Sequence, residues 1–228
     1  MITTMPSPRP DQFESHITVE CATERLDELG DWASARGLDF LHIVLARGRM
    51  ASQPMVTLTG TGSLAGHRRT VAAAAEALQA AGYRPVRVKT EAAPWNTGVP
   101  ADDAQAAALP ADTYFEHHLK LRLGPAADRE RITAVARAHG AHLSWNARRP
   151  AGEDGEDGEQ RFLTQRCHRV GLPTAGRRLA GLLADLARIP RPGGFEIRSV
   201  EREFVLHDSD ITVDDGWLDT QPQQEGGR

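Results

Sequence analysis

Two parts of the chain carry the same pattern in the same order, which indicates an internal duplication. The first copy contains FESHITV at residues 13–19, and the second contains FEHHLKL at residues 115–121. The later matches are SQ at 52–53 with TQ at 164–165, and AGHRR at 65–69 with AGRR at 175–178. A chance match of one short peptide would not preserve this order. Repeats of about 90 residues are too long for the unit of a solenoid and suit a small module with its own helices and strands.

The composition is that of an ordinary globular protein, and it limits the classes of partner. Of 228 residues, 40% are hydrophobic and 25% are charged, which is enough for one large or two small cores. The net charge of −4 gives no long-range attraction to nucleic acid, and no segment approaches the ~18 apolar residues of a membrane-spanning helix. Because the N-terminus also lacks the features of a secretion signal, we expect a cytoplasmic protein that binds neither nucleic acid nor membrane. Cys21 and Cys167 are expected to be buried free thiols.

Hydrophobic periodicity predicts six elements in each repeat, in the order β-α-β-β-α-β. In the first repeat, a strand with alternating polar and apolar residues at 13–21 leads into a helix that begins at Thr23 and ends at Gly37. The other elements expected in this repeat are strands at 38–46, 54–59 and 84–91 and an alanine-rich helix at 64–81. In the second repeat they are strands at 114–123, 141–148, 160–170 and 195–207 and helices at 126–139 and 174–187. This order predicts an α+β fold, a tandem duplication of a ferredoxin-like module whose two polar sheet faces form a shared cleft.

The segments outside the two modules are expected to be linkers and loops. The modules are expected at residues 12–92 and 113–208, joined by a proline-bearing linker at 93–112. A flexible arm is expected at 1–11 and a largely disordered tail at 209–228, and the acidic segment with Asp208, Asp210, Asp214 and Asp215 is expected to be solvated. The acidic, glycine-rich loop at 151–159 does not have the carboxylate spacing of a calcium-binding loop.

One face of each predicted sheet carries many ionisable side chains. Apolar residues of one parity, such as Ile17 and Val19, are expected to face the helices, so residues of the other parity form a polar face. In the first module this face has Glu14, His16, Thr18, Arg87, Lys89 and Glu91. In the second module it has Glu116, His118, Lys120, Arg122, Glu196 and Arg198. Because the first and last strands are neighbours in this topology, the histidines and the basic residues are expected to lie side by side.

The first chemistry that this face suggests is acid–base catalysis by His16 and His118. Each histidine follows a carboxylate, Glu14 or Glu116, by two residues on the same strand face, and that carboxylate would orient the imidazole and raise its pKa. The segment His16-Ile17-Thr18 resembles the His-x-Thr strand of the two-histidine phosphoesterases, which implies a hydrolase in which two histidines flank a phosphodiester. In the second copy, Lys120 stands where that motif has a hydroxyl.

A second interpretation is a metal site made of Glu14, His16, Glu116 and His118. Two imidazole nitrogens and two carboxylates suit zinc, iron or manganese. The pairing of repeats is similar to that of the vicinal oxygen chelate proteins, which hold a metal between modules, although here each repeat has a second helix where that family continues with strands. Lys89 would also oppose a bound cation. We therefore predict no cofactor, with a divalent metal as the alternative.

A third interpretation is anion binding without catalysis, by a ligand-binding or regulatory protein. The residues that would hold a phosphate or carboxylate through charge-assisted hydrogen bonds are Arg87, Lys89, Lys120, Arg122 and Arg198, with Thr18 and Glu91 beside them. The preferred interpretation remains an enzyme, a hydrolase or a lyase, that acts on a small anionic substrate. In it His16 and His118 are acid and base, and Lys89 and Lys120 hold the anion. We expect a monomer or homodimer.

Overall fold

The computed structural model describes residues 10–45, 47–147, 158–190 and 194–217, and eight strands and five α-helices lie within them. The first half contains β1 (Gln12–Glu20), α1 (Leu26–Ser34), β2 (Asp39–Leu45), β3 (Ser52–Thr61), α2 (Leu64–Ala80) and β4 (Arg84–Ala92). A short helix, α3 (Asp103–Ala107), follows. The second half contains β5 (Tyr114–Leu123), α4 (Arg129–Ala138), β6 (Ala141–Asn146), β7 (Glu159–His168), α5 (Leu172–Ala187) and β8 (Phe195–Asp208). The 3-10 turns are η1 (Thr23–Arg25) and η2 (Ile211–Asp214).

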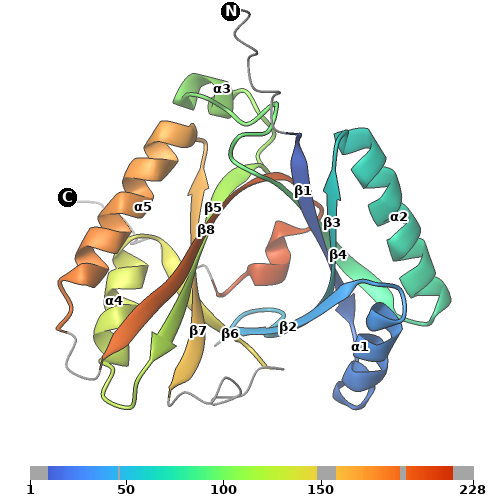
Figure 1. Cartoon of the computed structure of the whole chain (residues 1–228), viewed down its shortest axis with the longest axis horizontal. Coiled ribbons are helices and arrows are strands. Elements are labelled where there is room, and N and C mark those ends of the chain that lie inside the picture. The colour runs from blue at the N-terminus through green and yellow to red at the C-terminus, as the bar shows by residue number, and fades with distance from the viewer. Residues whose placement is uncertain (1–9, 46, 148–157, 191–193, 218–228) are drawn as a thin grey trace, which may run out of the picture.

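The eight strands form one closed barrel with the helices outside it (Figure 1). The order around the barrel is β1-β3-β2-β6-β7-β5-β8-β4, and every neighbouring pair is antiparallel. The two halves meet at two seams, where β2 pairs with β6 and β4 pairs with β8. Helices α1 and α2 lie on one side of the barrel, and α4 and α5 on the other.

The expected α+β fold, two ferredoxin-like modules around an open shared cleft, is therefore wrong. The edge strands β2 and β4, which would be free in a separate module, are hydrogen-bonded to β6 and β8 of the other half. An exposed strand edge presents unpaired backbone N–H and C=O groups, and closing the sheet into a barrel pairs them. As a result the two polar sheet faces are curled into the interior of a single barrel.

The outer face of the barrel is covered by apolar packing against the helices. In the first half, Ile17 and Val19 of β1 are fully buried and pack in one cluster with Leu29 of α1 and Leu78 of α2. A second cluster joins β5 to α4 and α5 through Leu119, Leu121, Ile132 and Leu182. Each such buried side chain is worth ~1.5–3 kcal/mol, which fixes the strand parity and sends the alternate residues inward. In the part of the chain that the structure describes, no helix has the length and apolarity needed to cross a membrane.

The C-terminal segment enters the barrel. Figure 1 shows η2, in red, within the ring of strands, and Asp214 and Trp217 are buried there. Gly48, in the turn between β2 and β3, has φ +123° and approaches this segment so closely that a Cβ would lie 3.1 Å from the carbonyl oxygen of Asp215. The prediction that the aspartates of this segment are solvated is therefore wrong for Asp208 and Asp214, which are buried.

Some expectations fall on residues that the structure does not describe. The expected arm is described only at residues 10 and 11, and the expected acidic loop only at 158 and 159. Of the expected tail, residues 218–228 lie outside the described residues.

Candidate functional site

The interior of the barrel contains a cavity of about 240 Å³ that is lined by residues from all eight strands and from the C-terminal segment. One part of its wall is apolar and comes from Leu41, Ile43, Leu45, Met55, Phe162 and Trp217. The rest is polar and includes Glu14, His16, Thr18, Arg87, Lys89, Glu116 and His118, all expected to lie at the site. A volume of this size holds several waters, at ~30 Å³ each, or one small organic molecule.

Buried acids and bases alternate in a continuous chain through the polar wall, which we call the ion chain. In order it consists of Glu91, Lys89, Glu116, Arg166, Asp214, Arg87 and Asp208. None of these side chains is more than 11% exposed. Buried charges must be paired to be tolerated, and in this chain each of the three cations contacts two carboxylates.

The distances along the ion chain are those of close ion pairs. Lys89 Nζ lies 2.8 Å from Glu91 Oε1 and also contacts Glu116 Oε2. Arg166 donates from Nε to Glu116 Oε1 at 2.6 Å and from Nη2 to Asp214 Oδ2 at 2.8 Å. The chain therefore joins β4 of the first half to β5 and β7 of the second.

Arg87 closes the far end of the ion chain. Its Nη1 donates to Asp214 Oδ2 at 2.9 Å, and its Nε donates to Asp208 Oδ1 at 2.8 Å. Asp208 also accepts a 2.8 Å hydrogen bond from the Tyr114 hydroxyl, and Asp214 Oδ1 accepts one of 2.7 Å from Gln53. The C-terminal segment is thus attached to the barrel wall through Asp214.

The basic residues expected to hold an anion do not form a free anion site in the described residues. Arg87 and Lys89 are inside the barrel but are neutralised by carboxylates of the ion chain. Lys120, Arg122 and Arg198 do not line the cavity. Arg122 Nε and Arg198 Nε lie 3.9 Å and 3.2 Å from Glu196 Oε2.

The two histidines have equivalent surroundings. Nδ1 of His16 is hydrogen-bonded to Thr57 Oγ1 at 2.8 Å, and Nδ1 of His118 to Thr164 Oγ1 at 3.1 Å. Each threonine is the direct cross-strand partner of its histidine, on β3 and on β7. These contacts hold both imidazoles in one orientation, with Nε2 turned toward carboxylates.

Each Nε2 faces two carboxylates, one from the histidine's own strand and one from the next strand. His16 Nε2 lies 3.5 Å from Glu14 Oε1 and 3.0 Å from Glu91 Oε2. His118 Nε2 lies 3.3 Å from Glu116 Oε2 and 3.5 Å from Glu203 Oε2. The contacts of each histidine with the carboxylate two residues earlier match the expected pairs.

The strand register makes Glu203 the counterpart of Glu91. Glu14 pairs with Glu91 across β1 and β4, and Glu116 pairs with Glu203 across β5 and β8. By the same register, the position of Lys89, opposite His16, is taken in the second half by Glu201, opposite His118. The first half therefore has a cation where the second half has a carboxylate.

Sequence reasoning missed Glu201 and Glu203 because β8 contains a bulge. The pairing of β5 with β8 shifts by one residue where Lys120 faces Ser199 and Leu121 faces Ile197. A bulge inserts one residue into one strand, so a count by twos from Glu196 reaches the wrong face. Thr57, Thr164 and Asp214 were also missed, and Arg166 could be placed on its strand but not assigned to a face, because its parity in the sequence is ambiguous.

The two equivalent glutamates have opposite pKa shifts. Burial raises the pKa of Glu91, but the positive charge of Lys89, followed by His16, outweighs burial and lowers this pKa to about 2. Burial, followed by the negative charge of Glu91, raises the pKa of Glu203 to about 8. Glu91 is therefore ionised at neutral pH, whereas Glu203 mostly keeps its proton.

The other pKa shifts follow from the ion chain. Burial opposes ionisation of Glu116, yet Lys89 and Arg166 hold its pKa well below the usual range. Burial also disfavours the charged form of His118, but the hydrogen bond to Glu116 and its negative charge raise the His118 pKa overall. His118, whose Nε2 lies 3.5 Å from Glu203, therefore holds a proton more readily than an ordinary histidine.

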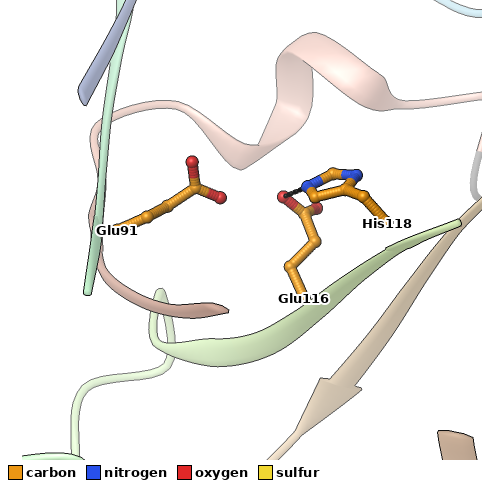
Figure 2. Close-up of side chains that lie close together, drawn as sticks. All are labelled: Glu91, Glu116 and His118. Atoms are coloured by element: carbon orange, nitrogen blue, oxygen red, sulfur yellow. Dashed lines mark ion pairs between the residues drawn. The ribbon is translucent and has the colours of Figure 1, made fainter. Parts of the chain in front are cut away.

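One group in the interior has the residue types of a metal site. Glu91, Glu116 and His118 each offer a ligand atom, and these atoms lie within 4.8 Å of one another (Figure 2). Neither oxygen of the 1% exposed Glu91 has a partner with hydrogen-bond geometry, although both are in ion-pair contact. The ammonium of Lys89, however, contacts both carboxylates. The ammonium of Lys89 therefore already neutralises this group, and a metal ion would have to displace it.

Comparisons with known proteins show no family for this chain. No protein-family model and no curated protein matches it. A putative monooxygenase from Fusobacterium nucleatum is 11% identical, with a TM-score of 0.34, over 90% of this chain and 96% of that chain. A W145V variant of chlorite dismutase from Candidatus Nitrospira defluvii is 10% identical, with a TM-score of 0.28, over 85% and 90%.

The ion chain corrects the expectation of a hydrolase that holds a phosphodiester. The lysine and arginine that would have held a phosphodiester, Lys89 and Arg87, are bound to carboxylates instead.

Proposed function

We propose that this protein is an enzyme that moves a proton on a small molecule held in the barrel cavity. The observation that carries this function is that two equivalent histidine–carboxylate groups line one cavity in the barrel. Glu203 with His118 would give the proton, and Glu14 with His16 would take it. A phosphate or carboxylate on the substrate is left out, because the interior cations are already paired.

The groups at the cavity are suited to proton transfer near neutral pH. A carboxyl group with a pKa of about 8, such as Glu203, is protonated at pH 7 and can still lose its proton. His118 Nε2 lies 3.5 Å away and can restore that proton. The threonine hydrogen bonds at Nδ1 keep both rings in place, so little reorganisation is required during the reaction.

The apolar part of the wall would hold the body of the substrate. Leu41, Met55 and Phe162 lie on strands that face the polar wall across the cavity. An apolar surface next to a few fixed polar groups is the usual composition of a small-molecule site. Such surroundings also strengthen electrostatic interactions with the reacting groups.

Ring opening of 5-nitrobenzisoxazole tests this function without knowledge of the natural substrate. A base removes the carbon-bound proton of this uncharged probe, its N–O bond breaks, and the resulting phenolate absorbs visible light. We expect the protein to accelerate this reaction above the buffer rate. His16→Ala and His118→Ala should each lower the rate by about 10²-fold, and the double variant should be little slower, because residues of one site are not additive.

The control variant is His207→Ala. His207 contacts Asp112 at 3.1 Å, is 45% exposed at its side chain and does not line the cavity, so its loss should leave the rate unchanged. Circular dichroism establishes that each variant is folded. A wild-type rate equal to that of buffer, or folded His16 and His118 variants with the wild-type rate, would rule out this function.

A further inference from the structure

We infer that the cavity takes a positively charged small molecule, an ammonium or amidinium compound with an apolar body, which enters through an opening in the barrel wall beside the end of β4. This inference rests on the proposed function, since it names the class of substrate for the same cavity. The steps that lead to it are the position of the opening, its charge and its apolar surroundings.

The barrel is closed between β4 and β8, but β4 pairs with only the C-terminal part of β8. β4 pairs with β8 from Lys89, opposite Asp208, to Ala92, opposite Phe204. β8 begins at Phe195, so its residues 195–203 have no partner on β4. A pocket of about 650 Å³ lies at this place. It is lined by the start of β1, the end of β3, residues 93–95 after β4 and residues 200–203 of β8.

Three carboxylates stand between this outer pocket and the inner cavity. Glu14, Glu201 and Glu203 line both, and we call them the acidic rim. A residue that lines two adjoining pockets marks the boundary between them. A molecule that enters the cavity from the outer pocket therefore passes the acidic rim.

The charge along this path favours a cation. Among the described residues, the rim residues form no ion pair with a lysine or arginine. Glu14 contacts His16, and Glu203 contacts His118. Among the described residues that line the outer pocket, Arg202 is the basic one. Further in, Arg87, Lys89 and Arg166 are each shared by two carboxylates. An entering anion would meet the carboxylates of Glu14 and Glu201 and the protonated carboxyl group of Glu203, against the one positive charge of Arg202.

The interior beside Glu203 has room for a further positive charge. Glu203 lines the cavity, where its ion-pair contact is with His118 Nε2 at 3.5 Å. Glu203 has a raised pKa because burial and the carboxylates of Glu91 and Glu14 outweigh the positive charges of His118 and Lys89. A cation next to Glu203 would therefore favour its ionised form and release its proton.

The apolar surface around the path suits an organic cation. Trp95 is 49% exposed and Val200 is 39% exposed, and both line the outer pocket. An indole face attracts cations through its quadrupole, and it lies on the same path as the acidic rim. Beyond the rim, the apolar part of the cavity would accept the body of the molecule.

Three probes of similar shape test the charge preference. Phenethylammonium, 2-phenylethanol and phenylacetate share a phenyl body and differ in the charge of the head group. By isothermal titration calorimetry at pH 7, we expect phenethylammonium to bind about tenfold more tightly than the alcohol, as a charged hydrogen bond would provide. Phenylacetate should bind more weakly than the alcohol.

Two substitutions locate the preference at the acidic rim. Glu201→Gln should weaken phenethylammonium binding about threefold, the usual effect of one partly exposed charge, and leave the alcohol unaffected. Glu196→Gln is the matched control, because Glu196 lies on the same strand but lines neither pocket. Titrations in two buffers of different ionisation heat should show proton release on phenethylammonium binding to the wild type and none in Glu203→Gln.

The outcomes separate this inference from the proposed function. Equal or tighter binding of phenylacetate, or no binding of any of the three probes, would overturn the cationic class. The ring-opening assay uses an uncharged probe and therefore reports on proton transfer independently. If the ring-opening rate depends on the histidines but the ammonium probe is not preferred, only the substrate class is wrong. If the ammonium probe is preferred but the rate does not change when the histidines are replaced, only the proposed function is wrong.

Discussion

At the scale of single residues, one difference between the halves sets the proton affinity of two equivalent carboxyl groups. Glu91 and Glu203 occupy matching positions, yet the pKa of Glu91 is lowered to about 2 and that of Glu203 is raised to about 8. Lys89 contacts Glu91, and the residue at the position of Lys89 in the second half is Glu201. The duplicated site thus contains one fixed anion and one group that can give up a proton.

The raised pKa of Glu203 predicts a loss of stability as the pH rises. A carboxyl group with a folded pKa of about 8, against 4.5 ordinarily, holds its proton more tightly in the folded state. Its stabilising contribution is complete below pH 4.5 and is lost as the pH rises through 8. Between pH 5.5 and 8.5, we expect the free energy of unfolding of the wild type to fall by about 3 kcal/mol more than that of Glu203→Gln.

Urea unfolding at several pH values measures this difference. The raised pKa of His118 acts in the same direction in both proteins and largely cancels. Glu196→Gln, which alters an exposed carboxylate of the same strand, should keep the wild-type pH dependence. Identical curves for the wild type and Glu203→Gln would show that Glu203 ionises normally.

At the scale of elements, η2 is a part of the barrel interior. Its last residue, Asp214, accepts hydrogen bonds from Arg87, Arg166 and Gln53, which lie on three different strands. Trp217 follows and donates from Nε1 to the carbonyl oxygen of Leu143 on β6 at 3.3 Å. The segment therefore links Arg166 to Arg87 within the ion chain and supplies part of the cavity wall.

Removing the charge of Asp214 should destabilise the protein strongly. Asp214→Asn leaves Arg87 and Arg166 with one carboxylate each in a buried place, and we expect a loss of about 3 kcal/mol in the free energy of unfolding. Asp215→Asn is the matched control, because this neighbour is exposed, and its effect should stay within about 0.5 kcal/mol. Urea unfolding of both variants gives the comparison. Equal effects would mean that the buried contacts of Asp214 contribute little.

Elements governed by local patterns could be predicted from the sequence, and their assembly could not. The strand expected at 114–123 is β5, with the same bounds, and its inward and outward residues follow the expected alternation. The face of β8 was mistaken after Glu196 because a bulge leaves no mark in hydrophobic periodicity. The short seam of β2 with β6, from Ile43 to Leu45, depends on contacts between distant segments that no local pattern records.

The candidate site was predictable to the same extent. Glu14, His16, Glu116 and His118 could be found because they recur in the duplicated motif, and they do line the cavity. Arg166 and Asp214 could not, since their role comes from ion pairs with residues about 50 or more positions away along the chain. Those partners also reverse the expected use of the cations, which neutralise carboxylates instead of holding an anion.

At the scale of the whole molecule, the two halves share one interior. Lys89 of the first half contacts Glu116 of the second, and the barrel is closed by two seams between the halves. Unfolding one half alone would expose two strand edges and leave buried charges of the other half without partners. Both effects are costly, so the halves should depend on each other for stability.

We therefore expect the chain to unfold in a single cooperative transition despite its duplication. In scanning calorimetry, the calorimetric enthalpy should equal the van't Hoff enthalpy, as for a two-state protein. Two resolved transitions, or a calorimetric enthalpy about twice the van't Hoff value, would show that the repeats behave as separate domains.

The ion chain also restricts how the sequence can drift. Each internal member has two neighbours of opposite sign, so a substitution at Arg166 changes what is tolerated at both Glu116 and Asp214. Residues that share partners in this way are strongly epistatic, because the cost of one change depends on the state of the others. Viable paths through sequence space must alter these positions in compensating pairs, and an exchange of charge at one end can extend along β4, β5 and β7 to the C-terminal segment.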